Sequence, residues 1–95
     1  MSFITDFSEY QVSTENIHNG VQYLYRFPNG HGASVVRHDY SYGNLDGLWE
    51  VASIEWDNIG WWLAPNKYGF DVRGWCSNED VSNILAEIRD SYPNI

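Results

Sequence analysis

The sequence predicts an α+β domain, in which an antiparallel meander of about four strands carries one C-terminal helix packed on one face. Three observations predict it. Residues 21–38 alternate in hydrophobicity around a Pro-Asn-Gly turn, residues 48–64 are rich in strand-forming side chains, and residues 78–91 carry an apolar stripe at helical spacing. The chain of 95 residues is sufficient for a single domain, residues 1–95, with a modest core.

The hairpin over residues 21–38 is the clearest element. Its apolar residues alternate with more polar ones on the first strand: Val21, Tyr23, Tyr25 and Phe27. Pro28 suits the second position of a turn, and Gly30 can adopt the left-handed conformation that closes a three-residue loop. The predicted register pairs Phe27 with His31, Tyr25 with Ala33 and Tyr23 with Val35. Residues 1–19 show no clean period, and we expect an N-terminal arm or a first element there.

The residues after the hairpin predict two further strands. Residues 39–47 have the composition of a loop, whereas Leu48–Trp56 has apolar residues at both parities, which is typical of a central strand. Residues 61–64 form a short strand that Pro65 ends. Residues 65–76 are compatible with either a loop or one more short strand.

The helix over residues 78–91 has clear boundary signals. Ser77 is a suitable N-cap, and Asp80 follows three residues later, as in a capping box. The apolar stripe consists of Val81, Ile84, Leu85 and Ile88, and Pro93 ends the helix. Because a helix of this length is only marginally stable alone, we expect it to pack on the aromatic face of the sheet.

The charge balance limits the classes of partner. The chain has 13 acidic and five basic residues, a net charge of −8, whereas average composition predicts roughly twelve of each. The acidity therefore reflects a shortage of Lys and Arg, which provide phosphate affinity, so we expect no direct nucleic-acid binding. No stretch resembles a membrane span or a signal peptide, and Cys76 is the only cysteine. We expect a cytoplasmic protein.

No residue pattern indicates catalysis. The three histidines have no metal-binding spacing, and His38 and Asp39, as neighbours on a strand, point to opposite faces. Cys76 precedes the helix but has no histidine partner in the sequence, so we interpret it as a small apolar core residue. We expect no enzyme activity, no metal and no cofactor.

The aromatic share of 17% either lets a small core bury much area with few residues or provides exposed anchors for a partner. The candidates most expected to be exposed are Tyr40 and Tyr42 in the loop and the Trp61-Trp62 doublet. Only one ring of the doublet can face a given side of its strand, so we expect one of the two outside the core. The acidic helix residues avoid the apolar stripe: Glu79, Asp80, Glu87 and Asp90. They form either an ordinary solvated face or an acidic surface for a basic partner.

A resemblance adds a biological setting. The run Tyr23–Arg37, with Tyr40-Ser41-Tyr42-Gly43 and Leu48-Trp49-Glu50 after it, resembles a group of small bacteriophage-encoded proteins over about residues 20–56. The resemblance implies a phage accessory protein in the bacterial cytoplasm, and it carries over no site residues. We therefore expect a protein that binds and inhibits a host protein with a basic surface, such as a defence component. The alternatives are a nucleic-acid mimic that blocks a DNA- or RNA-binding enzyme, and a structural component that forms homo-oligomers.

Overall fold

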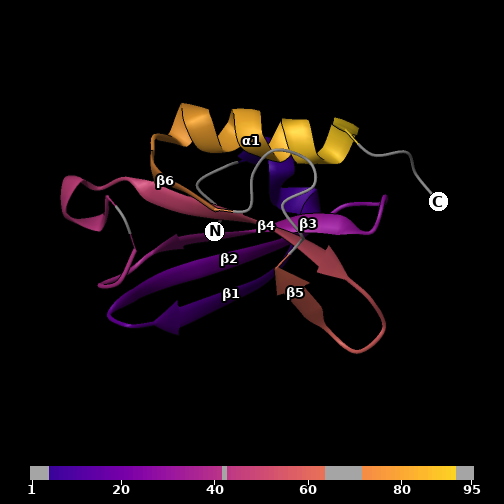
Figure 1. Cartoon of the computed structure of the whole chain (residues 1–95), viewed down its shortest axis with the longest axis horizontal. Helices are drawn as coiled ribbons and strands as arrows, with labels where there is room; N and C mark the ends of the chain where they lie inside the picture. The colour runs from indigo at the N-terminus through magenta and orange to yellow at the C-terminus, as the bar shows by residue number, and fades with distance from the viewer. Residues whose placement is uncertain (1–4, 42, 64–71, 92–95) are drawn as a thin grey trace.

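A twisted antiparallel sheet with one helix lying across it forms the molecule (Figure 1). The structure is a computed structural model that describes residues 5–41, 43–63 and 72–91. Its elements are the 3₁₀-helix η1 (Thr5–Tyr10), β1 (Gln11–Ile17), β2 (Gly20–Arg26), β3 (His31–Arg37), the 3₁₀-helix η2 (Asn44–Asp46), β4 (Trp49–Trp56), β5 (Trp61–Leu63), β6 (Val72–Cys76) and α1 (Asn78–Ser91). Within these residues, no helix has both the length and the apolar character needed to cross a lipid bilayer.

The strands follow the order β1-β2-β3-β4-β5, and β6 also pairs with β4. The two short strands share the outer edge of β4: β5 pairs with residues 54–56 and β6 with residues 49–52. The predicted α+β class with one C-terminal helix is confirmed, but the sheet has six strands within the described residues rather than about four. The additional strands β1 and β6 lie in the two segments whose patterns left more than one structure open.

The β2–β3 hairpin has the predicted register. Tyr25 pairs with Ala33 and Tyr23 with Val35, and the Phe27 amide donates to the His31 carbonyl at 2.8 Å. Gly30 has a φ of 83°, in the region that favours glycine. The prediction of a three-residue turn closed by this glycine is therefore confirmed.

The central position of β4 is also confirmed. It pairs with β3 along one edge and with β5 and β6 along the other. Val51 is buried in the core beneath the helix, whereas Ile54, at the opposite parity, is fully buried on the other face. Burial at both parities explains why the apolar pattern of this segment does not alternate.

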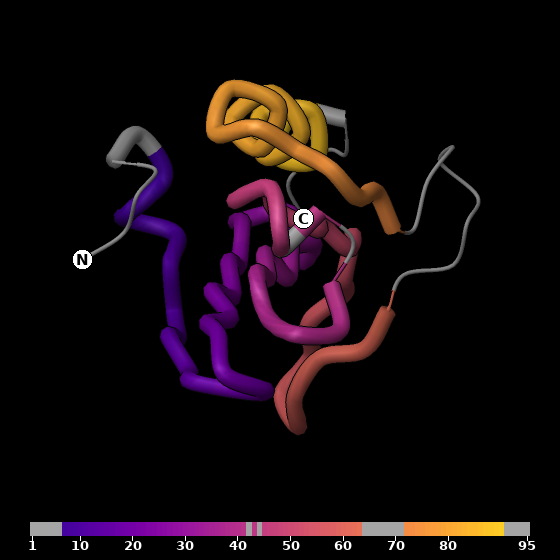
Figure 2. The backbone as a smooth tube through the Cα atoms, turned by 90° about the vertical axis from the view of Figure 1, so that its left-hand side faces the viewer, coloured from indigo at the N-terminus to yellow at the C-terminus, as the bar shows by residue number. Residues whose placement is uncertain are grey.

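The helix begins and packs as its sequence predicts. The Asp80 amide donates to Ser77 Oγ at 3.1 Å, and the Ser77 amide donates to Asp80 Oδ2 at 3.0 Å, which completes a capping box. The helix lies over one side of the sheet (Figure 2). Its apolar stripe packs on the aromatic face, within a core cluster of Phe7, Tyr25, Phe27, Ala33, Val35, Trp49, Val51, Cys76, Val81, Ile84, Leu85 and Ile88.

The N-terminal 3₁₀-helix closes one side of this core. Phe7 is buried and meets Phe27 edge-on, with 6.4 Å between ring centroids. The Arg89 guanidinium lies 5.2 Å from the centroid of the Phe7 ring. Residues from both ends of the described chain therefore meet over the β2–β3 hairpin.

Candidate protein-binding surface

The strand β5 presents three consecutive large apolar side chains to solvent. Trp61, Trp62 and Leu63 are 37%, 46% and 56% exposed. The turn before them is held by Asp57, whose Oδ1 accepts hydrogen bonds from the backbone amides of Ile59 at 2.8 Å and Gly60 at 2.9 Å. These bonds lower the pKa of the Asp57 carboxyl and keep the turn in a defined geometry.

The two tryptophans of the doublet face opposite sides of the sheet. Trp61 pairs with Trp56, on the face away from α1, and Trp62 pairs with Glu55 on the helix side. Neither ring is in the core, so the expectation that one of the two lies outside it is met, and the second ring lies outside it as well. The physical reason is that α1 lies over β3, β4 and β6, whereas β5 is a short strand at the outer edge.

A rigid platform supports β5 on the face away from the helix. Trp56 donates from Nε1 to the Tyr25 carbonyl at 2.8 Å, and the Arg26 guanidinium lies 5.6 Å from the centroid of the Trp56 ring. The indole crosses Gly32, where an added Cβ would lie 2.6 Å from Trp56 Nε1 and would overlap the Tyr25 carbonyl oxygen. The exposed side chains of β5 are therefore attached to a well-packed sheet.

The acidic residues of α1 are mostly engaged within the molecule. Asp80 caps the helix, as described above. Glu87 Oε2 lies 3.9 Å from Arg73 Nη1, and Asp90 accepts two hydrogen bonds from Arg89 at 2.9 and 3.1 Å. The Arg89 hydrogen bond lowers the pKa of Asp90. Glu79 is exposed in the first turn of the helix.

Tyr40 follows the end of β3 that lies beside the start of β4, whereas β5 pairs with the end of β4. It is 76% exposed, and its ring meets His18 edge-on at 4.8 Å, while His18 meets His38 at 5.2 Å. The Asn19 side-chain amide donates to Asp39 Oδ2 at 2.8 Å and joins the β1–β2 turn to this loop. The candidate anchor Tyr42 lies outside the described residues. The predicted partner-binding residues thus fall into three separate places: β5, the loop after β3 and the helix.

The residues weighed for catalysis are held in structural contacts. Asp39 pairs with Asn19, while His38 Nδ1 accepts a hydrogen bond from the Tyr40 amide at 3.1 Å, so the adjacent side chains have separate partners. Burial raises the pKa of the Cys76 thiol, and the nearby Asp80 carboxylate raises it further. Cys76 is buried in the core, which confirms its interpretation as a small apolar residue. Within the described ranges, no three His, Cys, Asp or Glu side chains converge to hold a metal ion.

Sequence reasoning missed one exposed aromatic residue. Trp75 in β6 is 59% exposed and has a φ of 52°, which is rare for a bulky residue. It lies where the pairing of β6 with β4 shifts register between Trp49 and Val51. The only signal in the sequence was the Gly-Trp pair in a segment that could be a loop or a strand.

Comparison of the chain with family models, with curated proteins and with solved structures finds no match.

Proposed function

We propose that this chain is a small binding protein that occupies and inhibits another protein, and that its setting is that of a phage accessory protein in a bacterial host. The target is a host protein with a basic surface, such as a component of a defence system. The observation that carries the proposal is the run of three exposed apolar side chains on β5, at 37%, 46% and 56% exposure.

Such a run is unusual outside an interface. Isolated exposed apolar residues are common, but Trp61 and Leu63 share one face of β5, and neighbouring large apolar side chains mark interaction surfaces, where Trp is enriched among the residues that dominate binding energy. Trp56 and the turn at Asp57 hold β5 in place before any partner arrives. A preorganised surface loses less conformational entropy on binding, which favours affinity.

The charge of the chain favours a basic protein as the partner. With 13 acidic residues against five basic ones, long-range attraction speeds encounters with a positive surface and weakens as salt rises. A nucleic-acid mimic would need acids aligned at phosphate-like spacing. On α1, Asp90 pairs with Arg89 and Glu87 lies near Arg73, which supports a protein-binding role over mimicry.

The proposal is tested by capture from host lysate at low and high salt, with mass spectrometry of the retained proteins. Three tagged forms are compared: the wild type, a Trp61→Ala/Trp62→Ala double variant, and a Leu45→Ala control that removes a side chain 95% exposed on η2. We expect one host protein to be retained by the wild type and the control, lost from the double variant and released by salt. Equal retention by all three forms would overturn the role of β5.

Self-assembly is distinguished by sedimentation of the same three forms at several concentrations. A monomer at all concentrations agrees with the proposed function. A wild-type oligomer that dissociates in the double variant would instead assign the β5 surface to contacts between copies of this chain.

A further inference from the structure

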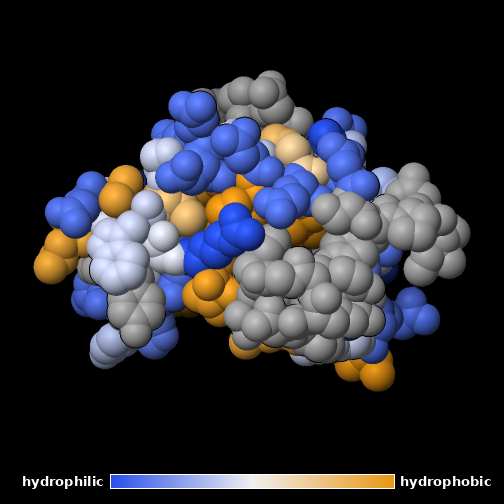
Figure 3. Space-filling model, turned by 45° about the horizontal axis from the view of Figure 1, so that its top comes forward, coloured by the Kyte–Doolittle hydropathy of each residue, from blue (hydrophilic) through white to orange (hydrophobic). Residues whose placement is uncertain are grey.

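A concave surface lies between α1 and β6, the strand that leads into the first turn of the helix (Figures 1 and 2). It is a groove of about 220 Å³, and the lining residues that define its character are Arg73, Trp75, Cys76, Asp80, Ile84 and Glu87. Figure 3 turns α1 toward the viewer and shows hydrophobic atoms between the polar outer side of the helix and the strands beneath it. The groove is separate from the β5 surface.

The groove has an apolar floor and an aromatic wall. Cys76 and Ile84 are buried at its base, and Trp75 stands 59% exposed beside them. The loop after β3 packs closely behind this wall, because an added Cβ on Gly43 would lie 3.0 Å from Trp75 Cα and 3.1 Å from its ring. The positive φ of Trp75 is a conformation that bulky non-glycine residues adopt rarely.

The rim of the groove carries an excess of negative charge. Asp80 and Glu87 contribute two carboxylates, and Arg73, 3.9 Å from Glu87, contributes one guanidinium. Burial raises the pKa of the Cys76 thiol at the floor of the groove, and the Asp80 carboxylate raises it further. An occupant with positive charge is therefore complementary to the rim.

The size of the groove selects the kind of occupant. Sites for drug-sized ligands usually enclose about 300–1,000 Å³, whereas this groove is smaller and matches one large side chain. A side chain that anchors an interface typically fills such a pocket near a ring of surrounding contacts.

We propose that the groove between β6 and α1 receives one bulky apolar side chain from an exposed segment of the partner protein, flanked by basic residues that pair with Asp80 and Glu87. The inference rests on the proposed protein-binding function and adds a second contact surface with defined chemistry. In the complex, Trp75 covers the inserted side chain and the carboxylates fix the flanking residues.

The test uses synthetic peptides as probes and backbone amide NMR as the readout. A capped Gly-Arg-Leu-Arg-Gly peptide is compared with Gly-Arg-Ser-Arg-Gly, which lacks the apolar side chain, and with Gly-Glu-Leu-Glu-Gly, which reverses the charge. We expect the first peptide to shift the amide signals of Trp75, Cys76 and Ile84 in a saturable, salt-sensitive manner. The other two should cause smaller shifts at the same concentration.

Two protein variants test whether the peptide binds in the groove. Glu87→Lys, at an exposed helix position, should weaken binding of the Arg-Leu-Arg peptide about two- to fivefold, the range for a partly exposed charge pair. Trp75→Ala should weaken binding of the Arg-Leu-Arg peptide without changing the chemical shifts caused by the Arg-Ser-Arg peptide. Far-UV circular dichroism confirms that both variants fold.

The outcomes separate this inference from the proposed function. One outcome is that host-protein capture depends on β5, but the peptides cause no shifts around Trp75 and Trp75→Ala does not change capture. That outcome would overturn the proposed groove site and leave the proposed function intact. Peptide shifts confined to the groove, with no host protein captured, would support the groove chemistry and overturn the proposed function.

Discussion

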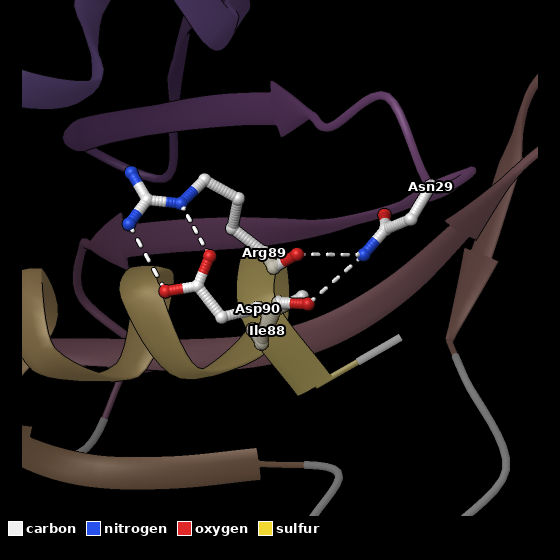
Figure 4. A network of polar contacts seen from close by, with 4 residues as sticks. All are labelled: Asn29, Ile88, Arg89 and Asp90. Atoms are coloured by element: carbon white, nitrogen blue, oxygen red, sulfur yellow. Dashed lines mark hydrogen bonds and ion pairs between the residues drawn. The ribbon is translucent and has the colours of Figure 1, made fainter. Parts of the chain in front are cut away.

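The side chain of Asn29, in the turn between β2 and β3, donates a hydrogen bond from Nδ2 to the Ile88 carbonyl oxygen in the last turns of α1, at 3.1 Å (Figure 4). A second bond from the same amide reaches the Arg89 carbonyl at 3.1 Å, and Asn29 Oδ1 accepts from the His31 amide at 3.0 Å. The last carbonyls of a helix have no partner within the helix itself. The hairpin turn thus caps the helix and fixes where it lies on the sheet.

Asn29→Ala should lower the free energy of unfolding by about 2–3 kcal/mol. The substitution leaves buried carbonyl groups and a buried amide without their partner, and Asn29 is only 2% exposed. Urea denaturation measures the change. Asn58→Ala, at an exposed turn position, is the matched control and should change stability by no more than about 0.5 kcal/mol. Equal losses in both variants would contradict the capping role.

Gly32→Ala should destabilise the protein by about 3 kcal/mol or prevent folding. The new Cβ would overlap the Tyr25 carbonyl oxygen and meet Trp56 Nε1 at 2.6 Å, and the backbone oxygen cannot move without breaking the sheet. Gly60→Ala is the control, because a Cβ there meets nothing within 4 Å. Thermal unfolding of both variants provides the comparison. A stable Gly32→Ala protein would show that Trp56 does not cross this position.

Replacing a tryptophan with alanine should lower the free energy of unfolding by an amount that depends on how deeply the ring is buried. Trp49 is 3% exposed, donates to Asn78 Oδ1 at 2.8 Å and lies under the Arg37 guanidinium at 4.3 Å, so Trp49→Ala should cost about 3–5 kcal/mol. Trp61→Ala and Trp62→Ala should each cost about 1 kcal/mol, because both rings already meet solvent. Urea denaturation of the three variants checks the order. A loss for Trp61 or Trp62 as large as that for Trp49 would mean that β5 belongs to the core.

Glu50 and Asp57 should have opposite effects on the pH dependence of stability. Burial raises the pKa of Glu50 in the folded protein, although His38 partly opposes the shift. The folded state therefore binds this proton more tightly, and the resulting stability is present below the unfolded pKa and lost as pH rises through the folded pKa. Glu50→Gln should accordingly raise the urea midpoint at pH 7 and lose that advantage near pH 3.5.

Asp57 provides the control with the opposite sign. The backbone amides of Gly60 and Ile59 lower the pKa of Asp57, so its contribution is present above the unfolded pKa and lost as pH falls through the folded pKa. Asp57→Asn should lower the midpoint at pH 7 and change it less at acid pH. Identical pH profiles for the two variants would contradict both assignments.

Trp75→Gly should be more stable than Trp75→Ala by about 1 kcal/mol. Both substitutions remove the ring, but only glycine adopts a φ of 52° without steric cost. The difference between the two urea denaturation curves isolates the backbone strain at this position. If alanine were as stable as glycine, the positive φ would carry no cost.

The elements that could be predicted from the sequence are those whose pattern is local. The alternation of β2, the Pro-Asn-Gly turn and the apolar stripe of α1 each depend on residues close together in the chain, and all three are confirmed. β1 was not distinguished from an arm, because most of its residues are exposed and it has no clean apolar face. β6 depends on pairing with Trp49–Ala52, a partner far away in the sequence.

The candidate site was harder to predict for the same reason. Trp61 and Trp62 are exposed because of where α1 and β6 lie on the sheet. The residues around the doublet do not encode that arrangement. The engagement of Asp90 could be inferred from the adjacent Arg89, but Glu87 meets Arg73 across two elements. The cap that Asn29 places on α1 joins residues 59 positions apart, and nothing near Asn29 in the sequence indicates it.

The meeting of Phe7 with Arg89 has a consequence for synthesis in the cell. While the ribosome is still producing the strands, the aromatic side chains of the β2–β3 hairpin have no helix above them, and the nascent chain exposes Tyr25 and Phe27 to solvent. These residues are fully covered only after α1 has left the exit tunnel.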